Sequence, residues 1–170
     1  MLTQGSVWVF SATPVKTAWH ISELVPHSGA MCLIDEVLDV EGETLRCALT
    51  VRNDGLFNDP DLGGDVPGWV GIEYMAQGVA AHIGVHRRRS GEGPRMGFLL
   101  GTRQYDCSVT SFKPGTRLVL SADRLMVSDL GLGTYDCRLE GDGVLATAKI
   151  IGFMPDSDAA FWAAVAGKSP

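Results

Sequence analysis

The chain has 170 residues, 45% of them hydrophobic and 20% charged, and its 14 basic and 20 acidic side chains give a net charge of −6. This apolar fraction excludes a disordered chain, and the acidic balance argues against a general nucleic-acid binder. Because the sequence has no run of about 18 apolar residues, we predict no transmembrane helix and expect a cytoplasmic protein.

The amino-terminal region is predicted to precede the folded domain. Residues 1–16 contain a short apolar run but lack the basic start of a signal peptide, and we interpret them as a loose N-terminal arm. Residues 17–170 contain no repeat and no linker-like run, which predicts a single domain. Its first element is a short helix over Thr17–Leu24, which ends before Pro26 because proline disfavours helix in the residue that precedes it.

A β-hairpin and a long loop are predicted next. Residues 31–40 read as a strand, and residues 44–51 alternate in polarity and return as its partner after a glycine turn. Residues 52–65 are crowded with Asn, Asp, Gly and Pro. A loop of this length is typical of functional or mobile segments.

The longest helical pattern runs from Pro67 to about Arg88. Asp65 is placed to cap this helix, Pro67 suits its first turn, and the arginines 87–89 complement the negative C-terminal end. Its interior is apolar on nearly every side. Such a helix is buried on most of its faces.

The remainder of the chain alternates with the period of β-strands. Glycine-rich breaks separate the segments, which predicts an antiparallel meander followed by a short helix over residues 157–166. The predicted strands are 96–105, 105–110, 117–128, 132–139 and 144–153. One long buried helix between a hairpin and a meander predicts an α+β fold, with an antiparallel sheet wrapped around one long central helix.

Glu73 stands out because it lies near the start of this apolar helix. Carboxylates are almost never fully buried without a partner, since desolvation disfavours their charged form. An apolar setting would keep Glu73 protonated, which suits a general acid near neutral pH. In the alternative interpretation, Glu73 faces solvent through a gap or pairs with an arginine.

Three histidines are candidates for site residues. His27 lies in a turn before a predicted buried strand, where it is either a hydrogen-bonded structural residue or a functional one. His82 and His86 are one helical turn apart, a spacing that can bind zinc. No third ligand stands at a recognised offset, so we predict no metal site.

Several other kinds of chemistry are not supported by the sequence. The four cysteines are spread out and lack a Cys-x-x-Cys pair, which indicates packed, reduced thiols. They are Cys32, Cys47, Cys107 and Cys137. No phosphate-binding glycine loop and no nucleophile elbow is present, so we predict neither a nucleotide cofactor nor any other cofactor.

Three segments form a set in a fixed order: Leu24–Asp35 (LVPHSGAMCLID), Val66–Gln77 (VPGWVGIEYMAQ) and, as a looser match, Phe112–Leu118 (FKPGTRL). Together they resemble the hotdog-fold β-hydroxyacyl-(acyl carrier protein) dehydratases. The motifs GIEYMAQ and LLGTR are closest to the divergent branch associated with aryl-polyene lipid biosynthesis. The resemblance covers about residues 20–153 and implies a hotdog fold.

This chain departs from the family at the catalytic histidine, which the family carries in a loop before the helix. Asp59 stands at the equivalent position, and no histidine occurs between Asn53 and Val70. The catalytic glutamate carries over to Glu73. We therefore consider His27 as the replacement base and keep Asp59 as a further catalytic candidate.

The resemblance implies loss of water from a 3-hydroxyacyl thioester to give a trans-2-enoyl thioester. His27 would remove the C2 proton, and protonated Glu73 would donate to the departing hydroxyl. The thioester oxygen would meet backbone N–H groups near Gly68 and Gly71 at the helix N-terminus, with further help from the strand that carries Gly97 and Gly101. The acyl chain would run past the apolar side chains Trp69, Ile72 and Met75.

The implied partners are an acyl carrier protein or a coenzyme A thioester, with no nucleic acid and no membrane span. The carrier's acidic surface could meet the arginines 87–89. Proteins of the family that this sequence resembles form homodimers, or larger dimer-based oligomers, by joining the edges of their sheets. Two alternatives stay open: an acyl thioesterase, for which Asp59 and Glu73 both suit activation of water, and a non-catalytic acyl-binding or partner subunit of a dehydratase.

Overall fold

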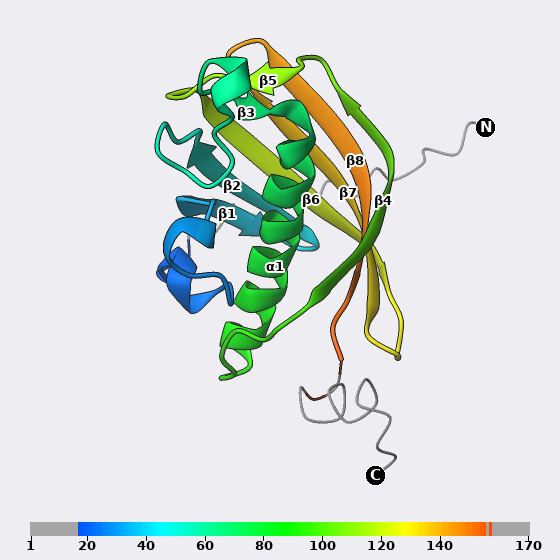
Figure 1. Ribbon diagram of the computed structural model, residues 1–170. Helices are drawn as coiled ribbons and strands as arrows, with labels where there is room; N and C mark the ends of the chain where they lie inside the picture. Colours follow the sequence, from blue (N-terminus) through cyan, green and yellow to red (C-terminus); the bar gives the residue numbers. More distant parts are fainter. Residues whose placement is uncertain (1–16, 156, 158–170) are drawn as a thin grey trace, which may run out of the picture.

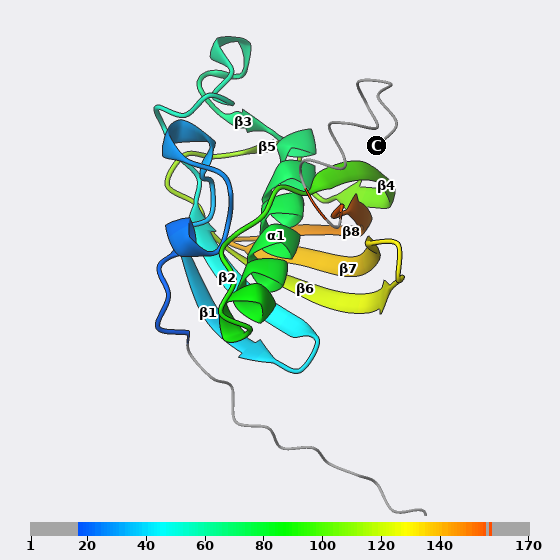
Figure 2. The ribbon, with the colours of Figure 1, turned by 90° about the horizontal axis from the view of Figure 1, so that it is seen from below.

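The computed structural model describes residues 17–155 and residue 157. The arm predicted for residues 1–16 and, apart from Ser157, the helix predicted for residues 157–166 lie outside this part of the chain. In the described part, a long helix, α1 (Gly71–Arg89), lies in the curve of a large antiparallel sheet (Figures 1 and 2). The predicted α+β architecture, with a sheet wrapped around one helix, is confirmed.

Six strands form the main sheet in the order β1-β2-β6-β7-β8-β4, and every neighbouring pair is antiparallel. Their bounds are β1 Glu36–Glu41, β2 Thr44–Thr50, β4 Phe98–Cys107, β6 Arg117–Val127, β7 Leu132–Gly141 and β8 Val144–Phe153. Two short strands, β3 (Val66–Pro67) and β5 (Ser111–Phe112), pair separately near the start of α1. Short 3₁₀ helices occupy Ile21–Glu23, Gly29–Met31, Pro60–Leu62 and Gly68–Val70.

The strands form because their apolar residues alternate and share the face that meets α1. In β6, Leu118, Leu120 and Ala122 are fully buried, while the residues between them are only partly buried. Each fully buried leucine contributes about 2 kcal/mol relative to an exposed one. This burial fixes the strand register, since a slip of one residue would turn every leucine outward.

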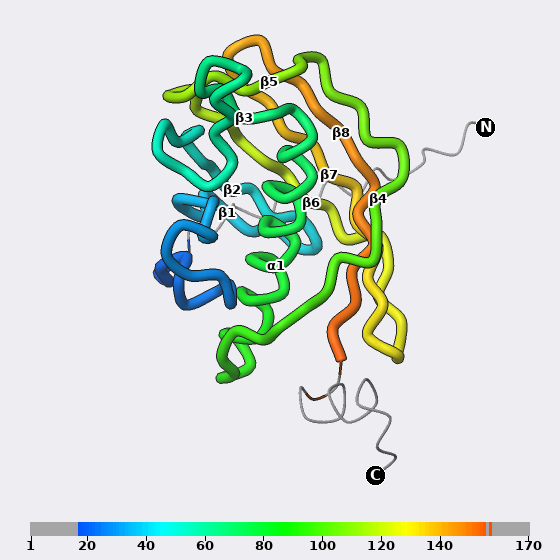
Figure 3. Tube along the Cα trace, viewed as in Figure 1, coloured from blue at the N-terminus to red at the C-terminus, as the bar shows by residue number. Residues whose placement is uncertain are grey.

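The helix approaches the sheet and the N-terminal turn closely, and two glycines make this possible. A Cβ atom at Gly78 would lie 2.1 Å from a side-chain carbon of Leu120, and one at Gly84 would lie 1.9 Å from the carbonyl oxygen of Leu24. The trace in Figure 3 accordingly shows the chain after residue 17, in blue, running alongside α1. This approach brings the segment that carries His27 next to the helix.

The order of the edge strands differs from the prediction. One continuous strand, β4 (Phe98–Cys107), runs across residue 105, where two separate strands over 96–105 and 105–110 were expected to meet. It pairs with β8, at the far end of the β6-β7-β8 meander. Its register shifts between Arg103 and Asp106, where Gln104 has a positive φ of 56°. This bulge interrupts the alternation and looks like a strand end in the sequence.

The first elements are also shorter than predicted. Only Ile21–Glu23 of the segment 17–24 is helical, as a 3₁₀ turn. The first strand begins at Glu36, and Gly29–Met31 ahead of it forms another 3₁₀ turn. Tertiary contacts with α1 fix this segment, so the local apolar pattern that suggested a strand does not decide its structure.

The long helix also begins later than predicted. Pro67 belongs to β3, a 3₁₀ turn follows over Gly68–Val70, and α1 begins only at Gly71. Asp65 does not cap the helix, because its carboxylate accepts a hydrogen bond of 2.8 Å from the Ser111 hydroxyl. The β3–β5 pairing therefore replaces the predicted cap.

Candidate active site

Glu73 and His27 come together although they lie far apart in the sequence. Glu73 is in the first turn of α1, and His27 lies between the two N-terminal 3₁₀ turns. The Nε2 atom of His27 is 3.9 Å from Oε1 of Glu73, and each side chain is 28% exposed. Glu73 is therefore half-buried beside an imidazole, not enclosed by apolar groups alone.

Gln77 holds this arrangement in place from one helical turn further along. Its side chain is fully buried, and its Oε1 accepts a hydrogen bond of 2.8 Å from the Leu33 N–H. Its Nε2 donates to the Met31 carbonyl and to Oε1 of Glu73, each at 2.8 Å. Gln77 thus ties the catalytic candidate on the helix to the backbone of the segment that carries His27.

The two sides of the His27 ring lie in different surroundings. Its Nδ1 is shielded from solvent and has no hydrogen-bonding partner among residues 17–155 and 157. Its Nε2 faces Glu73. The ring therefore presents Nε2 to the site and buries Nδ1.

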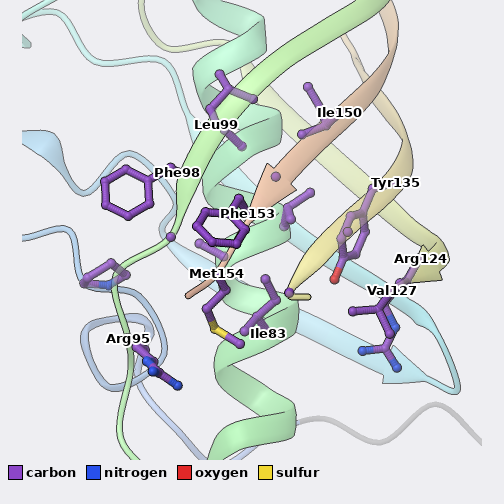
Figure 4. Close-up of a pocket in the computed structure, with 18 of the residues that line it drawn as sticks. Ile83, Arg95, Phe98, Leu99, Arg124, Val127, Tyr135, Ile150, Phe153 and Met154 are labelled. Carbon is purple, nitrogen blue, oxygen red and sulfur yellow. The ribbon is translucent and has the colours of Figure 1, made fainter. Parts of the chain in front are cut away.

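An apolar cavity of about 260 Å³ opens beside this pair, between α1 and strands β4, β7 and β8 (Figure 4). His27 and Glu73 both line it. The helix contributes small and aliphatic side chains at helical spacing from Glu73, and the strands contribute larger apolar ones. The apolar lining residues are Ala76, Val79, Ala80, Ile83, Phe98, Leu99, Val127, Ile150, Phe153 and Met154. A cavity of this kind suits an acyl chain.

Polar groups also line the cavity, on the side of β6 and β7. Tyr135 and Arg124 point toward the same region in Figure 4. The Tyr135 hydroxyl is 3.3 Å from Nδ1 of His82, and burial raises the pKa of Tyr135 to about 12. Arg124 is ion-paired with Glu43. A neutral phenol and a paired guanidinium therefore border the cavity, which Arg95 also lines.

The His82–His86 pair forms a hydrogen bond of its own. The two Nε2 atoms are 3.1 Å apart, and His82 is fully buried. The pKa of His82 is lowered to about 3, mainly by burial and secondly by the neighbouring His86. Its imidazole is therefore neutral at physiological pH. Within the described residues, no group of three His, Cys, Asp or Glu side chains gathers as metal ligands would.

Of the predicted substrate-binding residues, Gly97 lines the cavity. The three apolar helix residues expected along the acyl chain do not line it. Trp69 is 61% exposed and stacks edge-on against Phe57 at 6.3 Å between ring centres. Met75 is buried in the core and Ile72 packs against that core from outside. The helix is rotated so that residues 76, 80 and 83 face the cavity instead.

The backbone donors expected at Gly68 and Gly71 are already used. The Gly68 N–H donates to the Thr110 carbonyl at 2.8 Å, and the Gly71 N–H bonds to the preceding 3₁₀ turn. Both glycines serve close packing, because a Cβ at Gly68 would lie 2.8 Å from the Val109 carbonyl oxygen. A Cβ at Gly71 would lie 2.3 Å from the Tyr105 hydroxyl. These two N–H groups are therefore not free to bind a thioester oxygen in this structure.

Two further candidates lie away from the Glu73–His27 pair. Gly101 is on β4 but does not line the cavity. Asp59 caps the 3₁₀ turn Pro60–Leu62, and its Oδ1 accepts from the Asp61 N–H at 2.9 Å. Its carboxylate thus stabilises the loop turn, and it is not among the cavity-lining residues.

The cysteines form no part of this site. All four are free thiols, and the two on β2 and β7 are buried. Burial raises the pKa of the Cys47 thiol and raises that of Cys137 to about 12. Neither thiol is therefore ionised at neutral pH, so neither is an activated nucleophile.

A large antiparallel sheet wrapped around one long helix is the hotdog fold, and in this chain the Glu73–His27 pair lies beside its apolar cavity. Residues 19–163 match the model of the ApeP-like family, described as ApeP dehydratase. The chain belongs to this family of dehydratases, and the predicted resemblance to the aryl-polyene branch is confirmed.

Several solved structures are similar to this chain. The chain is 28% identical to a chain of the dehydratase heterocomplex ApeI:P from Xenorhabdus doucetiae, with a TM-score of 0.79 over 88% of this chain and 99% of that chain. The uncharacterized protein PH1136 from Pyrococcus horikoshii is 12% identical, with a TM-score of 0.57 over 87% of this chain and 98% of that one. The TT0310 protein from Thermus thermophilus is 19% identical, with a TM-score of 0.50 over 70% and 90%. The last two show the fold alone.

No curated protein matches the chain. Among the described helices, none is long and apolar enough to cross a membrane.

Proposed function

We propose that this protein removes water from a 3-hydroxyacyl thioester, giving a trans-2-enoyl thioester, in fatty-acid-like or polyene lipid biosynthesis. Glu73 and His27 are the polar groups that act on the reacting part of the substrate. Membership of the ApeP-like dehydratase family supports the reaction class. The observation that carries the proposal is the 3.9 Å approach of His27 Nε2 to Glu73 Oε1 at the wall of an apolar cavity.

This geometry suits elimination because a carboxyl group and an imidazole lie close to the same apolar space. Removal of the C2 proton and donation to the C3 hydroxyl each need a group within hydrogen-bond reach of the reacting atom. The hydrocarbon part of the chain can then occupy the cavity formed by Ala76, Ala80 and Ile83 on the helix and by the strands opposite. Exclusion of water from such a cavity strengthens the electrostatic interactions inside it.

We propose an acyl carrier protein, or coenzyme A, as the group that carries the thioester. Three arginines end α1 and make this end of the helix basic. Arg87 pairs with Glu92 and Arg88 donates to the Glu23 carbonyl, whereas Arg89 is exposed at the end of the helix. A basic helix end attracts an acidic carrier. A cytoplasmic location remains a prediction.

We also propose that the protein works as a dimer or dimer-based oligomer joined through β4. This strand lies at one edge of the sheet and presents Leu99 and Leu100, which are 44% and 57% exposed. An open edge with apolar side chains favours pairing with a second sheet. The partner is a second copy or a related dehydratase subunit, and the similar structure from Xenorhabdus doucetiae is described as a heterocomplex.

The test is turnover of defined thioesters by the purified protein and by Glu73→Gln. With a 3-hydroxyacyl thioester, the native protein should form the enoyl thioester, and Glu73→Gln should lower the rate by about 10²–10⁴-fold. Glu41→Gln, at an exposed carboxylate at the end of β1, is the matched control and should keep full activity. Turnover by Glu73→Gln at the native rate contradicts the assignment of this site.

An acyl thioesterase is the second candidate function, since a carboxylate can activate water for hydrolysis. Saturated acyl thioesters separate the two, because hydrolysis releases a thiol whereas dehydration leaves the thioester intact. Asp59→Asn should leave dehydration unchanged, given its place in the loop turn. A third possibility, a non-catalytic partner subunit, predicts acyl binding without turnover and activity in a complex that does not respond to Glu73→Gln.

A further inference from the structure

We infer that the two catalytic groups divide their work in a particular way: ionised Glu73 removes the C2 proton and later delivers it to the departing hydroxyl, while neutral His27 donates a hydrogen bond from Nε2 to the thioester oxygen. This inference rests on the proposed dehydration. It reverses the roles that the family resemblance implies, in which the histidine is the base. Three features of the described residues lead to it.

The first feature is the fixed orientation of the Gln77 side-chain amide. Its Oε1 faces the Leu33 N–H and its Nε2 faces the Met31 carbonyl. A flipped amide would place its NH₂ group against the Leu33 N–H and its oxygen against the Met31 carbonyl, so that neither hydrogen bond could form. The second hydrogen on Nε2 therefore points to Oε1 of Glu73, at 2.8 Å. Glu73 Oε1 is thus an acceptor in every state of the site.

The second feature is what this donor does to the carboxyl group. Because Oε1 is occupied by Gln77, any proton that Glu73 gains must sit on Oε2. Oε2 has no hydrogen-bonding partner among residues 17–155 and 157, so it is the oxygen left to exchange a proton with a substrate in the cavity.

The third feature is the tautomer of His27. A proton on Nδ1 would be a donor shielded from solvent and unpartnered within the described residues. An unsatisfied buried donor is costly, and the alternative tautomer leaves only a lone pair there. The proton therefore resides on Nε2, the nitrogen that faces Glu73 and the cavity. A neutral imidazole with its proton on Nε2 cannot accept another proton at that atom.

Glu73 can then carry the proton through the whole reaction by itself. Glu73 Oε2 takes the C2 proton, and the electron pair of the C2–H bond moves toward the thioester carbonyl, whose oxygen accepts a hydrogen bond from His27 Nε2. As the C2=C3 double bond forms, the C3–O bond breaks and its electron pair leaves with the hydroxyl oxygen. That oxygen takes the proton from Glu73 Oε2, so water departs and Glu73 is a carboxylate again. His27 keeps its proton throughout.

This assignment also explains where the developing negative charge is stabilised. The backbone N–H groups of Gly68 and Gly71, expected for that task, are bonded within the fold. His27 Nε2–H supplies the donor at the place where the charge forms. The histidine missing from the loop before α1 is then not needed as a base.

The experiment compares His27→Gln, His27→Ala and Glu73→Gln, after circular dichroism has shown that each is folded. A glutamine amide keeps a donor at the Nε2 position but cannot act as a base. We expect His27→Gln to retain kcat within about tenfold of the native enzyme and His27→Ala to lose about 10²-fold. His27→Gln should also keep the acid limb of the pH profile of kcat/KM. Loss of activity in His27→Gln as severe as in Glu73→Gln, or loss of that limb, overturns the inference.

A second measurement needs no substrate and keeps this inference separate from the proposed reaction. The chain has 4 histidines, so the ¹⁵N spectrum of the imidazoles can be assigned by comparison with His27→Gln. The inference requires the His27 proton on Nε2, and a proton on Nδ1 overturns it. Failure of the native enzyme to dehydrate any 3-hydroxyacyl thioester removes the proposed function, whereas the tautomer still reports on the geometry of the pair.

Discussion

The buried His82 makes the stability of the protein depend on pH, and the direction follows from its pKa. Burial lowers this pKa from 6.5 to about 3 in the folded protein, whereas the unfolded chain has the ordinary value. Above pH 6.5 the imidazole is neutral in both states. Below it, the unfolded state binds a proton that the folded state refuses, so stability is lost as the pH falls from 6.5 toward 3.

The size of the effect follows from the difference between the two pKa values. The full difference corresponds to about 5 kcal/mol as an upper bound, and at pH 5 the loss is about 2 kcal/mol. His86 has its pKa lowered in the same direction by burial, so its contribution adds to that of His82. A loss of this size is a large share of the stability of a small domain.

Urea unfolding of the native protein and of His82→Asn at pH 7, 6 and 5 measures this effect. The variant removes the titrating ring while keeping a polar group opposite the Tyr135 hydroxyl, and its free energy of unfolding should fall less steeply with decreasing pH. The difference between the two proteins should shrink by about 2 kcal/mol between pH 7 and pH 5. Equal slopes for both proteins would refute the assignment of a neutral, buried His82.

Three further changes test other parts of the structure. Gln77→Leu should destabilise the protein by about 2–4 kcal/mol in urea unfolding, because the Leu33 N–H and the Met31 carbonyl lose their buried partner; a loss below about 1 kcal/mol would contradict this. Ala80→Phe should fill part of the cavity and lower kcat/KM by about tenfold or more without reducing the melting temperature, whereas unchanged kinetics would place the acyl chain elsewhere. Gly84→Ala should cost about 1–3 kcal/mol by thermal unfolding, since its Cβ would overlap the Leu24 carbonyl, and a neutral effect would show that the helix shifts freely.

The sequence was sufficient to predict the architecture and the pairing of Glu73 with His27 as candidates. Period-two alternation and one apolar helix lead to the sheet and helix because burial enforces both patterns. The β4–β8 pairing was not predictable in the same way, since it joins strands separated by the whole meander. The bulge at Gln104 hides the continuity of β4, because it breaks the alternation that marks a strand.

The lining of the cavity was only partly predictable. Residues three and seven positions after Glu73 share its helix face, so Ala76 and Ala80 could have been found from spacing alone. Trp69 and Met75 were predicted to contact the acyl chain because they are hydrophobic, but hydrophobicity alone does not distinguish a core face from a cavity face. Gln77, one turn after Glu73, carried the same spacing signal. The polar lining by Tyr135 and Arg124 depends on strand register and could not be derived before the sheet was known.

The central claim is that Glu73 and His27 act on a substrate held in the cavity beside α1. A crystal structure with a bound, non-reactive 3-hydroxyacyl thioester analogue tests it most directly. The account predicts the acyl chain between α1 and strands β4, β7 and β8, with C2 about 3–3.5 Å from Glu73 Oε2 and the thioester oxygen within hydrogen-bond distance of His27 Nε2. An analogue bound with its thioester away from both side chains would contradict it.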